Sequence, residues 1–241
     1  MPIKLSVIVP CYNEKERFKN GLNHFLSYLN KQKYTWQLIL INDGSTDNTL
    51  ELMEGTAKDN KNINIISYRK NKGKGYAIIQ GVKRARGKLI LFSDLDHSVP
   101  VSTVETFFKY FEKGFDVVIG SRRVEGSKFI KRQNLIRETL GRGFTLLVRI
   151  FIDWDIKDAT CGFKAFTNPA AKKLFSSISV YDWAFDAELL FLCKKYGYKN
   201  AQAPVTWQDV RGSKVSLIRD ILGSFVGLIK IRINDAFKKY S

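Results

Sequence analysis

Histidine, cysteine and proline are scarce in this chain of 241 residues, which contains two, three and five of them respectively. The cysteines, Cys11, Cys161 and Cys193, form no CxxC pair, and two histidines are too few for a His-rich zinc site. We therefore expect a protein of a reducing compartment. Long apolar runs are missing as well, because no charge-free stretch approaches the roughly 18 residues of a spanning helix. The first residues also lack a signal-peptide core, so we expect a chain that does not cross a bilayer unaided.

Acidic residues are few relative to basic ones. The 23 Asp and Glu residues stand against 40 Lys and Arg residues, which gives a formal net charge of +17. This charge predicts an anionic partner, namely nucleic acid, a phosphorylated substrate or an acidic membrane surface, and charge alone does not choose among them. A nucleic-acid-binding protein is one hypothesis, but no zinc-finger, RNP1 or basic-zipper pattern supports it. Another is a non-catalytic membrane-surface module, in which acidic turns would only cap helices.

Strands and helices alternate along the chain, which can bury one sizeable core because 44% of its residues are hydrophobic. Apolar runs and helical spacing in the first half predict a repeated βα pattern, which is typical of a parallel sheet. The predicted strands are 5–9, 37–41, 63–67, 89–92, 116–120, 159–167 and 201–207. The predicted helices are 18–29, 50–57, 76–85, 101–111, 134–150, a short one opened by Pro169, and 183–195, and 128–132 is expected to be an exposed loop.

The apolar strand at 89–92 is the expected centre of the sheet. Asp94 and Asp96 follow directly after its carboxyl end. Open α/β sheets bind ligands at that end. Two carboxylates one residue apart can converge on one divalent cation, and oxygen ligands suit Mg²⁺ or Mn²⁺ bound together with substrate phosphates. The alternative is that Asp96 or Ser98 caps a helix that begins near Pro100.

Three further turns follow predicted strands or precede helices. Asp43, at the end of the second strand, could accept hydrogen bonds from a base or ribose, whereas Asp47 is expected to cap the next helix. The aromatic ring of Tyr12 could stack on a base beside Glu14, or 10–14 could be an ordinary loop. The basic turn at 72–75 matches neither the Walker pattern nor a dinucleotide fingerprint, and it could hold phosphate or face solvent.

Several motifs in fixed order resemble one known family. PCYNE (10–14), NDGSTDNT (42–49), GKGYAIIQG (73–81), DLDHS (94–98) and GSR (120–122) are together similar to the inverting family 2 glycosyltransferases, which use nucleotide-sugar donors. DATCGFKAF (158–166), WAFDAELL (183–190) and VTWQDVRGSKV (205–215) resemble the polyprenyl-phosphate glycosyltransferases, closest to the dolichyl-phosphate β-glucosyltransferase branch. The resemblance implies a GT-A, Rossmann-like α/β fold with a mainly parallel sheet flanked by helices.

The resemblance also implies roles for individual positions. Asp94, Leu95 and Asp96 occupy the positions that bind donor diphosphate and Mg²⁺ or Mn²⁺, and Ser98 stands where the related mannosyltransferases carry a metal-ligating Gln. Arg122, together with Asp94 and Asp96, is expected to be catalytic. The remaining implied donor-binding positions are Pro10, Tyr12, Glu14, Ile41, Asp43 and Lys214, and the implied acceptor-phosphate positions are Arg122 and Arg137.

Two departures argue against a mannosyl-type site. Gly141 replaces an acceptor-contacting Ser, and Gln208 falls where the mannosyltransferases have an Arg, which leaves Arg211 as an uncertain substitute. The resemblance therefore implies transfer of glucose, or of N-acetylglucosamine, from a UDP-sugar to dolichyl or polyprenyl phosphate, with a GDP-mannose-dependent enzyme as the alternative. Asp186 and Glu188 could orient sugar hydroxyls or basic partners, or they could be ordinary residues of a helix face.

The last segment has the pattern of an amphipathic helix. We expect a catalytic domain over 1–215 and a separate helix over 216–241, with apolar residues at Ile218, Ile221, Leu222, Phe225, Ile229 and Ile233. Arg219, Lys230, Asn234 and Lys238 fall largely on the other side. The helix could dock on the core or lie in the interface of an anionic membrane. The acceptor lipid favours the interface, which would place the protein at the cytoplasmic face of the membrane as a peripheral enzyme.

Overall fold

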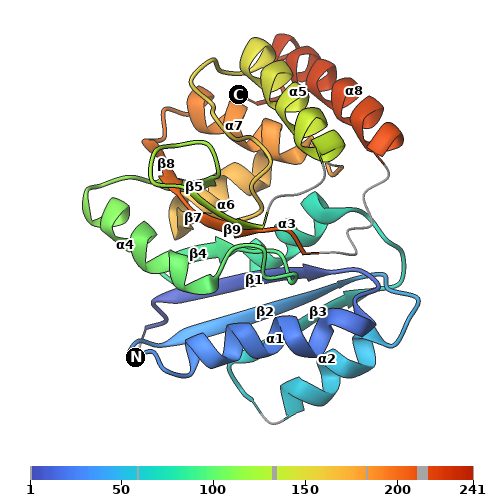
Figure 1. Ribbon diagram of the computed structural model, residues 1–241, viewed down its shortest axis with the longest axis vertical. Coiled ribbons are helices and arrows are strands. Elements are labelled where there is room, and N and C mark those ends of the chain that lie inside the picture. The colour runs from blue at the N-terminus through green and yellow to red at the C-terminus, as the bar shows by residue number, and fades with distance from the viewer. Residues whose placement is uncertain (1, 59, 132–134, 183, 211–216, 241) are drawn as a thin grey trace.

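A seven-stranded sheet forms the centre of the computed structural model, which describes residues 2–58, 60–131, 135–182, 184–210 and 217–240 (Figure 1). The strand order is β3-β2-β1-β4-β7-β5-β8. The strands are β1 (Leu5–Cys11), β2 (Trp36–Asp43), β3 (Ile63–Tyr68), β4 (Leu89–Phe92), β5 (Val117–Ser121), β7 (Lys164–Thr167) and β8 (Asn200–Pro204). Strands β1 to β4 pair in parallel, as the βα pattern predicts.

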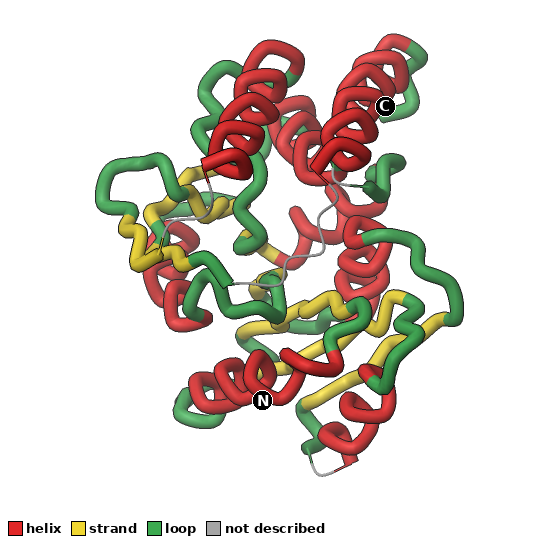
Figure 2. The backbone as a smooth tube through the Cα atoms, turned by 45° about the vertical axis from the view of Figure 1, so that its right-hand side comes forward, coloured by secondary structure: helices red, strands yellow, loops and turns green. Residues whose placement is uncertain are grey.

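Helices cover both faces of this sheet (Figure 2). They are α1 (Lys15–Leu29), α2 (Thr49–Lys58), α3 (Lys74–Arg84), α4 (Val104–Glu112), α5 (Leu135–Phe151), α6 (Asn168–Ser177), α7 (Phe185–Lys195) and α8 (Leu217–Ala236), with a short 3₁₀ helix, η1, at Val101–Thr103. Alternate side chains of one strand enter different cores: Ile8 packs with α3 and α6, whereas Val7 and Val9 pack with α1 and α4. Burial on both faces explains the nearly continuous apolar runs of these strands.

Strand β7 is the main departure from the predicted parallel sheet. It pairs antiparallel with both β4 and β5, and Leu91 lies opposite Ala165. The predicted strand 159–167 is therefore wrong in its first half, because only Lys164–Thr167 joins the ladder and the preceding residues form a loop. An apolar run shows that a segment is buried, but it does not show where pairing starts or in which direction the strand runs.

A second, two-stranded sheet was not expected. Residues 128–132, predicted as an exposed loop, contain strand β6 (Lys128–Lys131), which pairs in parallel with β9 (Thr206–Gln208). All four residues of β6 are exposed, so the strand carries no apolar alternation that a sequence pattern could detect. The predicted strand 201–207 is accordingly two strands, β8 and β9, in different sheets.

Helix α8 packs on the domain with one side. Leu228 and Ile231 are buried in the same core as α7, and Asn234, expected on the polar side, is buried and donates a hydrogen bond to Ser179 Oγ (2.9 Å). Just after the helix, the buried Tyr240 hydroxyl donates to Glu188 Oε1. These contacts bear out the docking alternative for part of the helix.

The other side of α8 is apolar and exposed. Its exposed apolar side chains are Phe225, Val226, Ile229, Ile233 and, just beyond the helix, Phe237. Helix α5 packs beside α8, with the rings of Phe151 and Phe225 in edge contact at 6.1 Å, and α5 also exposes Leu146 and Ile150. The side chains of Ile218, Arg219, Ile221 and Leu222 lie outside the described part of the structure. Across the described ranges, every helix is too short or too polar to pass through a bilayer.

Candidate active site

Asp94 and Asp96 lie in the turn that leaves the carboxyl end of β4, as predicted. The turn is tight, since His97 adopts a positive φ of 61° and the Ser98 amide donates to Asp96 Oδ1 at 2.9 Å. Burial raises the pKa of the Asp96 carboxyl, and the negative charge of Asp94 raises it further. Two carboxylates that repel each other at the ligand-binding edge of a sheet form a site that favours a cation.

The residues of this turn fit a hard divalent cation. Asp94 and Asp96 would supply carboxylate oxygens, and Ser98 lies beside Asp96, where its backbone amide donates to that carboxylate. No third His, Cys, Asp or Glu completes a metal-ligating cluster within the described ranges. Mg²⁺ commonly takes only one or two carboxylates and completes its shell with water and substrate phosphate. The donor set is therefore sufficient for such an ion bound together with a diphosphate.

Lys74, the first residue of α3, reaches the same place from the basic turn at 72–75. Its ammonium forms an ion pair with Asp94 Oδ1 at 2.5 Å. Burial lowers the pKa of Lys74, but the charges of Asp94 and Asp186 outweigh this effect and leave the pKa raised. Lys74 is therefore a fixed cation at the acidic turn. The sequence alone allowed two interpretations of the basic turn at 72–75, a phosphate contact or a solvated face.

Gly162 is a site residue that the sequence reasoning did not single out. A Cβ on Gly162 would overlap the Oδ2 atom of Asp94 and would come within 3.2 Å of Lys74 Nζ. The loop before β7 therefore approaches the Asp94 carboxylate so closely that only glycine fits. The available signal was a glycine inside the apolar run 159–167, since an isolated glycine in a strand-like pattern often marks a close backbone approach.

A buried ion pair lies beneath this loop. Lys164 Nζ binds Asp186 Oδ1 at 2.6 Å and also donates to the Cys161 carbonyl oxygen at 2.6 Å. Burial raises the pKa of the Asp186 carboxyl, and the charges of Lys164 and Lys74 oppose that shift. Glu188 is also buried and accepts hydrogen bonds from the amides of Ser179 and Val180. Asp186 thus binds a basic partner, which was one of the alternatives for these acids. Neither acid is solvated, so the alternative of an ordinary helix face with one solvated acid is wrong.

The expected nucleoside side of the site consists of two turns that hold each other. Asn13, after β1, receives a hydrogen bond from the Thr46 amide at 2.7 Å, and its own amide donates to Ser45 Oγ at 3.0 Å. Glu14 forms an ion pair with Arg17 at 2.7 Å. The ring of Tyr12 is 40% exposed, so it is available to stack on a base. Asp47 accepts a hydrogen bond from the Thr49 amide at the start of α2, as its predicted capping role requires.

Asp43 ties the second turn to the basic turn. Its carboxylate accepts hydrogen bonds from the amides of Lys72 (2.8 Å) and Gly73 (3.0 Å) and from Asn71 Nδ2 (2.9 Å). Burial raises its pKa, and these donors act in the opposite direction. Ile41 and Leu95 are buried in the two cores, so any contact between them and a donor would come from the backbone. Pro10 is partly exposed beside Tyr12.

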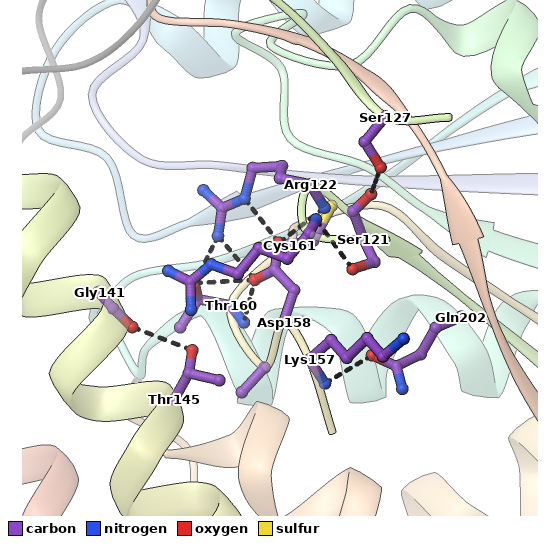
Figure 3. Close-up of polar contacts among 12 residues, drawn as sticks. Ser121, Arg122, Ser127, Gly141, Thr145, Lys157, Asp158, Thr160, Cys161 and Gln202 are labelled. Atoms are coloured by element: carbon purple, nitrogen blue, oxygen red, sulfur yellow. Dashed lines mark hydrogen bonds and ion pairs between the residues drawn. The ribbon is translucent and has the colours of Figure 1, made fainter. Parts of the chain in front are cut away.

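Arg122 follows β5 and points to Asp158 (Figure 3). Its Nε and Nη2 atoms donate to the two carboxylate oxygens at 2.7 and 2.8 Å, and Nη2 also donates to Thr160 Oγ1 at 2.7 Å. Burial raises the pKa of Asp158, but the Arg122 guanidinium outweighs this and holds it at about 2. The guanidinium of Arg122 also lies over the Trp207 ring at 5.6 Å, so this side chain is held on two sides. Arg137 lies in α5 with its side chain outside the description, and Lys214 and Arg211 lie outside the described residues altogether.

The fold and this acidic turn define a class of protein. A mostly parallel α/β sheet with carboxylates at the end of its central strand is the arrangement of the GT-A glycosyltransferases. Glucosyl-3-phosphoglycerate synthase from Mycobacterium tuberculosis, solved with Mg²⁺ and UDP, superposes on the chain with a TM-score of 0.70. The match covers 95% of this chain and 79% of that one at 18% identity, so it shows a shared fold.

Sequence comparison gives the family. The glycosyl transferase family 2 pattern matches residues 6–175, and the chain belongs to this family. The dolichyl-phosphate β-glucosyltransferase of Saccharomyces cerevisiae is 35% identical over 250 residues, which covers 96% of this chain and 75% of the yeast protein. The human dolichyl-phosphate β-glucosyltransferase is 34% identical over 229 residues, which covers 88% of this chain and 69% of the human protein. The predicted resemblance to this branch is confirmed.

Proposed function

We propose that this glycosyltransferase moves glucose from UDP-glucose to a dolichyl or other polyprenyl phosphate, with inversion to a β-linked sugar phosphate. The observation that carries the proposal is the Asp94 and Asp96 turn at the end of β4, in a chain whose relatives at 34 and 35% identity are named dolichyl-phosphate β-glucosyltransferases. The UDP bound to the Mycobacterium tuberculosis synthase supports a uridine nucleotide as donor. Tyr12, Glu14 and Asp43 are the proposed nucleoside contacts.

Asp94 and Asp96 are the proposed ligands of Mg²⁺ or Mn²⁺, with Ser98 beside them. The bound ion would neutralise negative charge on the departing nucleoside diphosphate. Lys74 already carries a positive charge to Asp94 at 2.5 Å, so it is placed to act on the same phosphates. Gly162 keeps the backbone close enough to fix the Asp94 carboxylate in one position.

The acceptor needs positioning rather than a strong base. A lipid monophosphate has a second pKa near about 6, so at neutral pH its oxygen is already an anionic nucleophile. Arg122 is held in one orientation by its two hydrogen bonds to Asp158, which suits a residue that orients a phosphate. Arg137 and Lys214 remain proposed phosphate contacts on the resemblance alone.

The acceptor lipid requires the protein to reach a membrane. The exposed apolar side chains of α5 and α8 lie on neighbouring helices, and basic side chains such as Arg142, Lys230 and Lys239 surround them. An apolar face bordered by cations suits the interface of an anionic bilayer. We propose peripheral binding through this face, at the cytoplasmic side of the membrane.

A transfer assay tests the proposal. Purified protein is incubated with radiolabelled UDP-glucose, a polyprenyl phosphate and Mg²⁺ or Mn²⁺, and lipid-extractable label is counted. We expect a glucosylated lipid, and we expect Asp96→Asn to lower turnover by orders of magnitude because it removes one charge from the metal site. Glu112→Gln, which makes the same change at the exposed end of α4, is the matched control and should stay active.

Three results would contradict the proposal. Full activity in excess chelator would remove the role of the metal, and near-normal turnover of Asp96→Asn would remove the role of the turn. Preference for GDP-mannose over UDP-glucose would show that the mannosyl alternative is correct despite Gln208. A circular dichroism spectrum for each variant separates loss of activity from loss of fold.

A further inference from the structure

A polar cavity lies away from the Asp94 and Asp96 turn, and none of the proposed donor-binding or metal-binding residues is among its lining residues. It has a volume of about 580 Å³ and lies between α5, the residue after Arg122 and the loop that follows α5. Its walls include Arg123, Arg142, Leu146, Arg149, Trp154 and Lys157. Asp155 is the single acidic residue among its lining residues, so four cationic side chains share the cavity with one carboxylate. Such an excess of positive charge favours an anionic occupant.

The protein does not neutralise these cations fully. Arg142 forms an ion pair with Glu138 at 2.6 Å, and Arg149 donates to the Trp154 carbonyl oxygen at 2.9 Å. Within the described ranges, the guanidinium of Arg123 and the ammonium of Lys157 have no hydrogen-bond or ion-pair partner. Burial lowers the pKa of Arg123, and the charges of Arg122 and Arg142 lower it further against the opposing charge of Asp158. The side chain of Arg123 is therefore half-buried, and its surroundings disfavour its positive charge.

Asp158 is the buried acid whose charge acts most strongly on Arg123, but its carboxylate is occupied by other donors. Asp158 already accepts from the Arg122 backbone amide, from Nε and from Nη2, and its Oδ1 atom accepts from the Thr160 amide at 3.2 Å (Figure 3). Both carboxylate oxygens are thus occupied by several donors. A partly buried charge without a partner is unfavourable, and a bound anion would offset this cost.

Two apolar side chains, Leu146 and Trp154, also line the cavity. Leu146 is 48% exposed and Trp154 is 59% exposed, and the guanidinium of Arg149 lies over the Trp154 ring at 4.3 Å. Leu146 and Ile150 continue the apolar surface along α5 toward α8. An occupant would therefore place an anionic group among Arg123, Arg142 and Lys157 and an apolar part against Leu146 and Trp154. Cavities of this size hold molecules larger than a simple ion.

We propose that this cavity binds the phosphate group of a lipid at the membrane surface, as a site separate from the donor site. Guanidinium groups pair with phosphate oxygens in a bidentate manner, which suits Arg123 and Arg142. The phosphate can come from an anionic phospholipid or from the lipid acceptor itself, because both present a phosphate on an apolar chain. Binding at this site does not require the donor sugar, so the proposal can be tested without the transfer reaction.

Trp154 provides the measurement. Its fluorescence is followed while the full chain, without nucleotide, is titrated with dihexanoyl phosphatidic acid, dihexanoyl phosphatidylcholine, farnesyl phosphate or inorganic phosphate. We expect a saturable change with phosphatidic acid or farnesyl phosphate and a much weaker response to phosphatidylcholine. The same titration of Trp154→Phe should lose the change, which assigns the signal to this side chain.

Charge variants test the contact itself. Arg123→Gln should weaken binding of the lipid phosphate by roughly tenfold or more, since a hydrogen bond to a charged group contributes about 1.5–3 kcal/mol. Lys19→Gln removes the same charge on the exposed side of α1, at the far end of the molecule (Figure 1), and should leave binding unchanged. Calorimetry with UDP on both variants shows whether the donor site is intact.

The outcomes separate the sources and can overturn the proposal. Tighter binding of phosphatidic acid assigns the site to a membrane phospholipid, and tighter binding of farnesyl phosphate assigns it to the acceptor. The proposal is wrong if no saturable change occurs, if inorganic phosphate binds as tightly as both lipids, or if Lys19→Gln weakens binding as much as Arg123→Gln. Failure of the transfer assay would leave these binding results unaffected.

Discussion

The ion pair between Lys164 and Asp186 allows a quantitative test of how the site is supported. The Lys164 side chain is 0% exposed and that of Asp186 is 6% exposed, with 2.6 Å between Nζ and Oδ1. Removing one partner of a buried ion pair typically costs about 3–5 kcal/mol. We therefore expect Asp186→Ala or Lys164→Met to lower the free energy of unfolding by about that amount. In a chain of this size, each kcal/mol shifts Tm by about 2–4 °C, so Tm should fall by roughly 10 °C.

A double variant separates charge from packing. In Lys164→Met/Asp186→Leu, both charges are replaced by apolar side chains of similar size, and the desolvation cost disappears with them. We expect the double variant to be more stable than either single variant, although each single change is destabilising. Turnover should remain low, because Lys164 Nζ also holds the Cys161 carbonyl oxygen at 2.6 Å in the loop that carries Gly162.

Urea unfolding followed by circular dichroism gives the stabilities, and the transfer assay gives turnover. The reasoning would be refuted if either single variant lay within about 1 kcal/mol of the original protein, or if the double variant were as unstable as the sum of both singles. A stable double variant with normal turnover would show that the pair supports the fold but does not position the loop.

Three further predictions concern the site. Gly162→Ala should lower turnover strongly while the protein stays folded, because the added Cβ overlaps Asp94 Oδ2; normal kinetics would show that the loop moves away easily. The pKa of Asp158 is held at about 2 in the folded state, against about 3.9 in an unfolded chain, so about 2 kcal/mol of stability should be present above pH 4 and lost as the pH falls toward 2. Urea unfolding of the original protein between pH 5 and 2 should show this loss of stability, and the Asp158→Asn variant should not show it. If the free energies of unfolding of the two proteins changed with pH in parallel, the low pKa of Asp158 would be contradicted. Calorimetry should show tighter binding of UDP than of GDP in the presence of Mg²⁺ or Mn²⁺, and equal affinities would argue against the uridine donor.

Much of the first half could be predicted because its signals are local. The apolar runs of β1 to β4 and the turn residues after them are close together in sequence, and the carboxyl ends of parallel strands meet at one edge. The position of Asp94 and Asp96 therefore followed from the strand alone. Leu89–Phe92 was predicted with its observed bounds, since Gly87 and the following turn residues limit it on both sides.

The second half was harder to predict because its interactions join distant residues. Arg122 was expected to face a phosphate, and its main partner, Asp158, lies 36 residues away, immediately before the predicted strand 159–167. The apolar run 159–167 did not show that β7 is antiparallel, and β6 has no buried face to produce a pattern. On α8, spacing identified an amphipathic helix but placed Asn234 on the exposed side. The Asn234 amide is buried because Ser179 and Tyr240 provide it with hydrogen-bond partners.

The antiparallel β7 has a consequence for the order in which the chain folds during synthesis. One edge of β4 pairs with β1 early, but its other edge has no partner until Lys164–Thr167 has left the ribosome. Until then, Leu89–Phe92 is an apolar strand with an open edge, which is a template for association between nascent chains. Strand β5 also needs β7 before it can join this part of the sheet, because β7 lies between β4 and β5. One four-residue strand therefore joins β5 and β8 to the rest of the sheet, and this non-local step is expected to limit the folding rate of the whole domain.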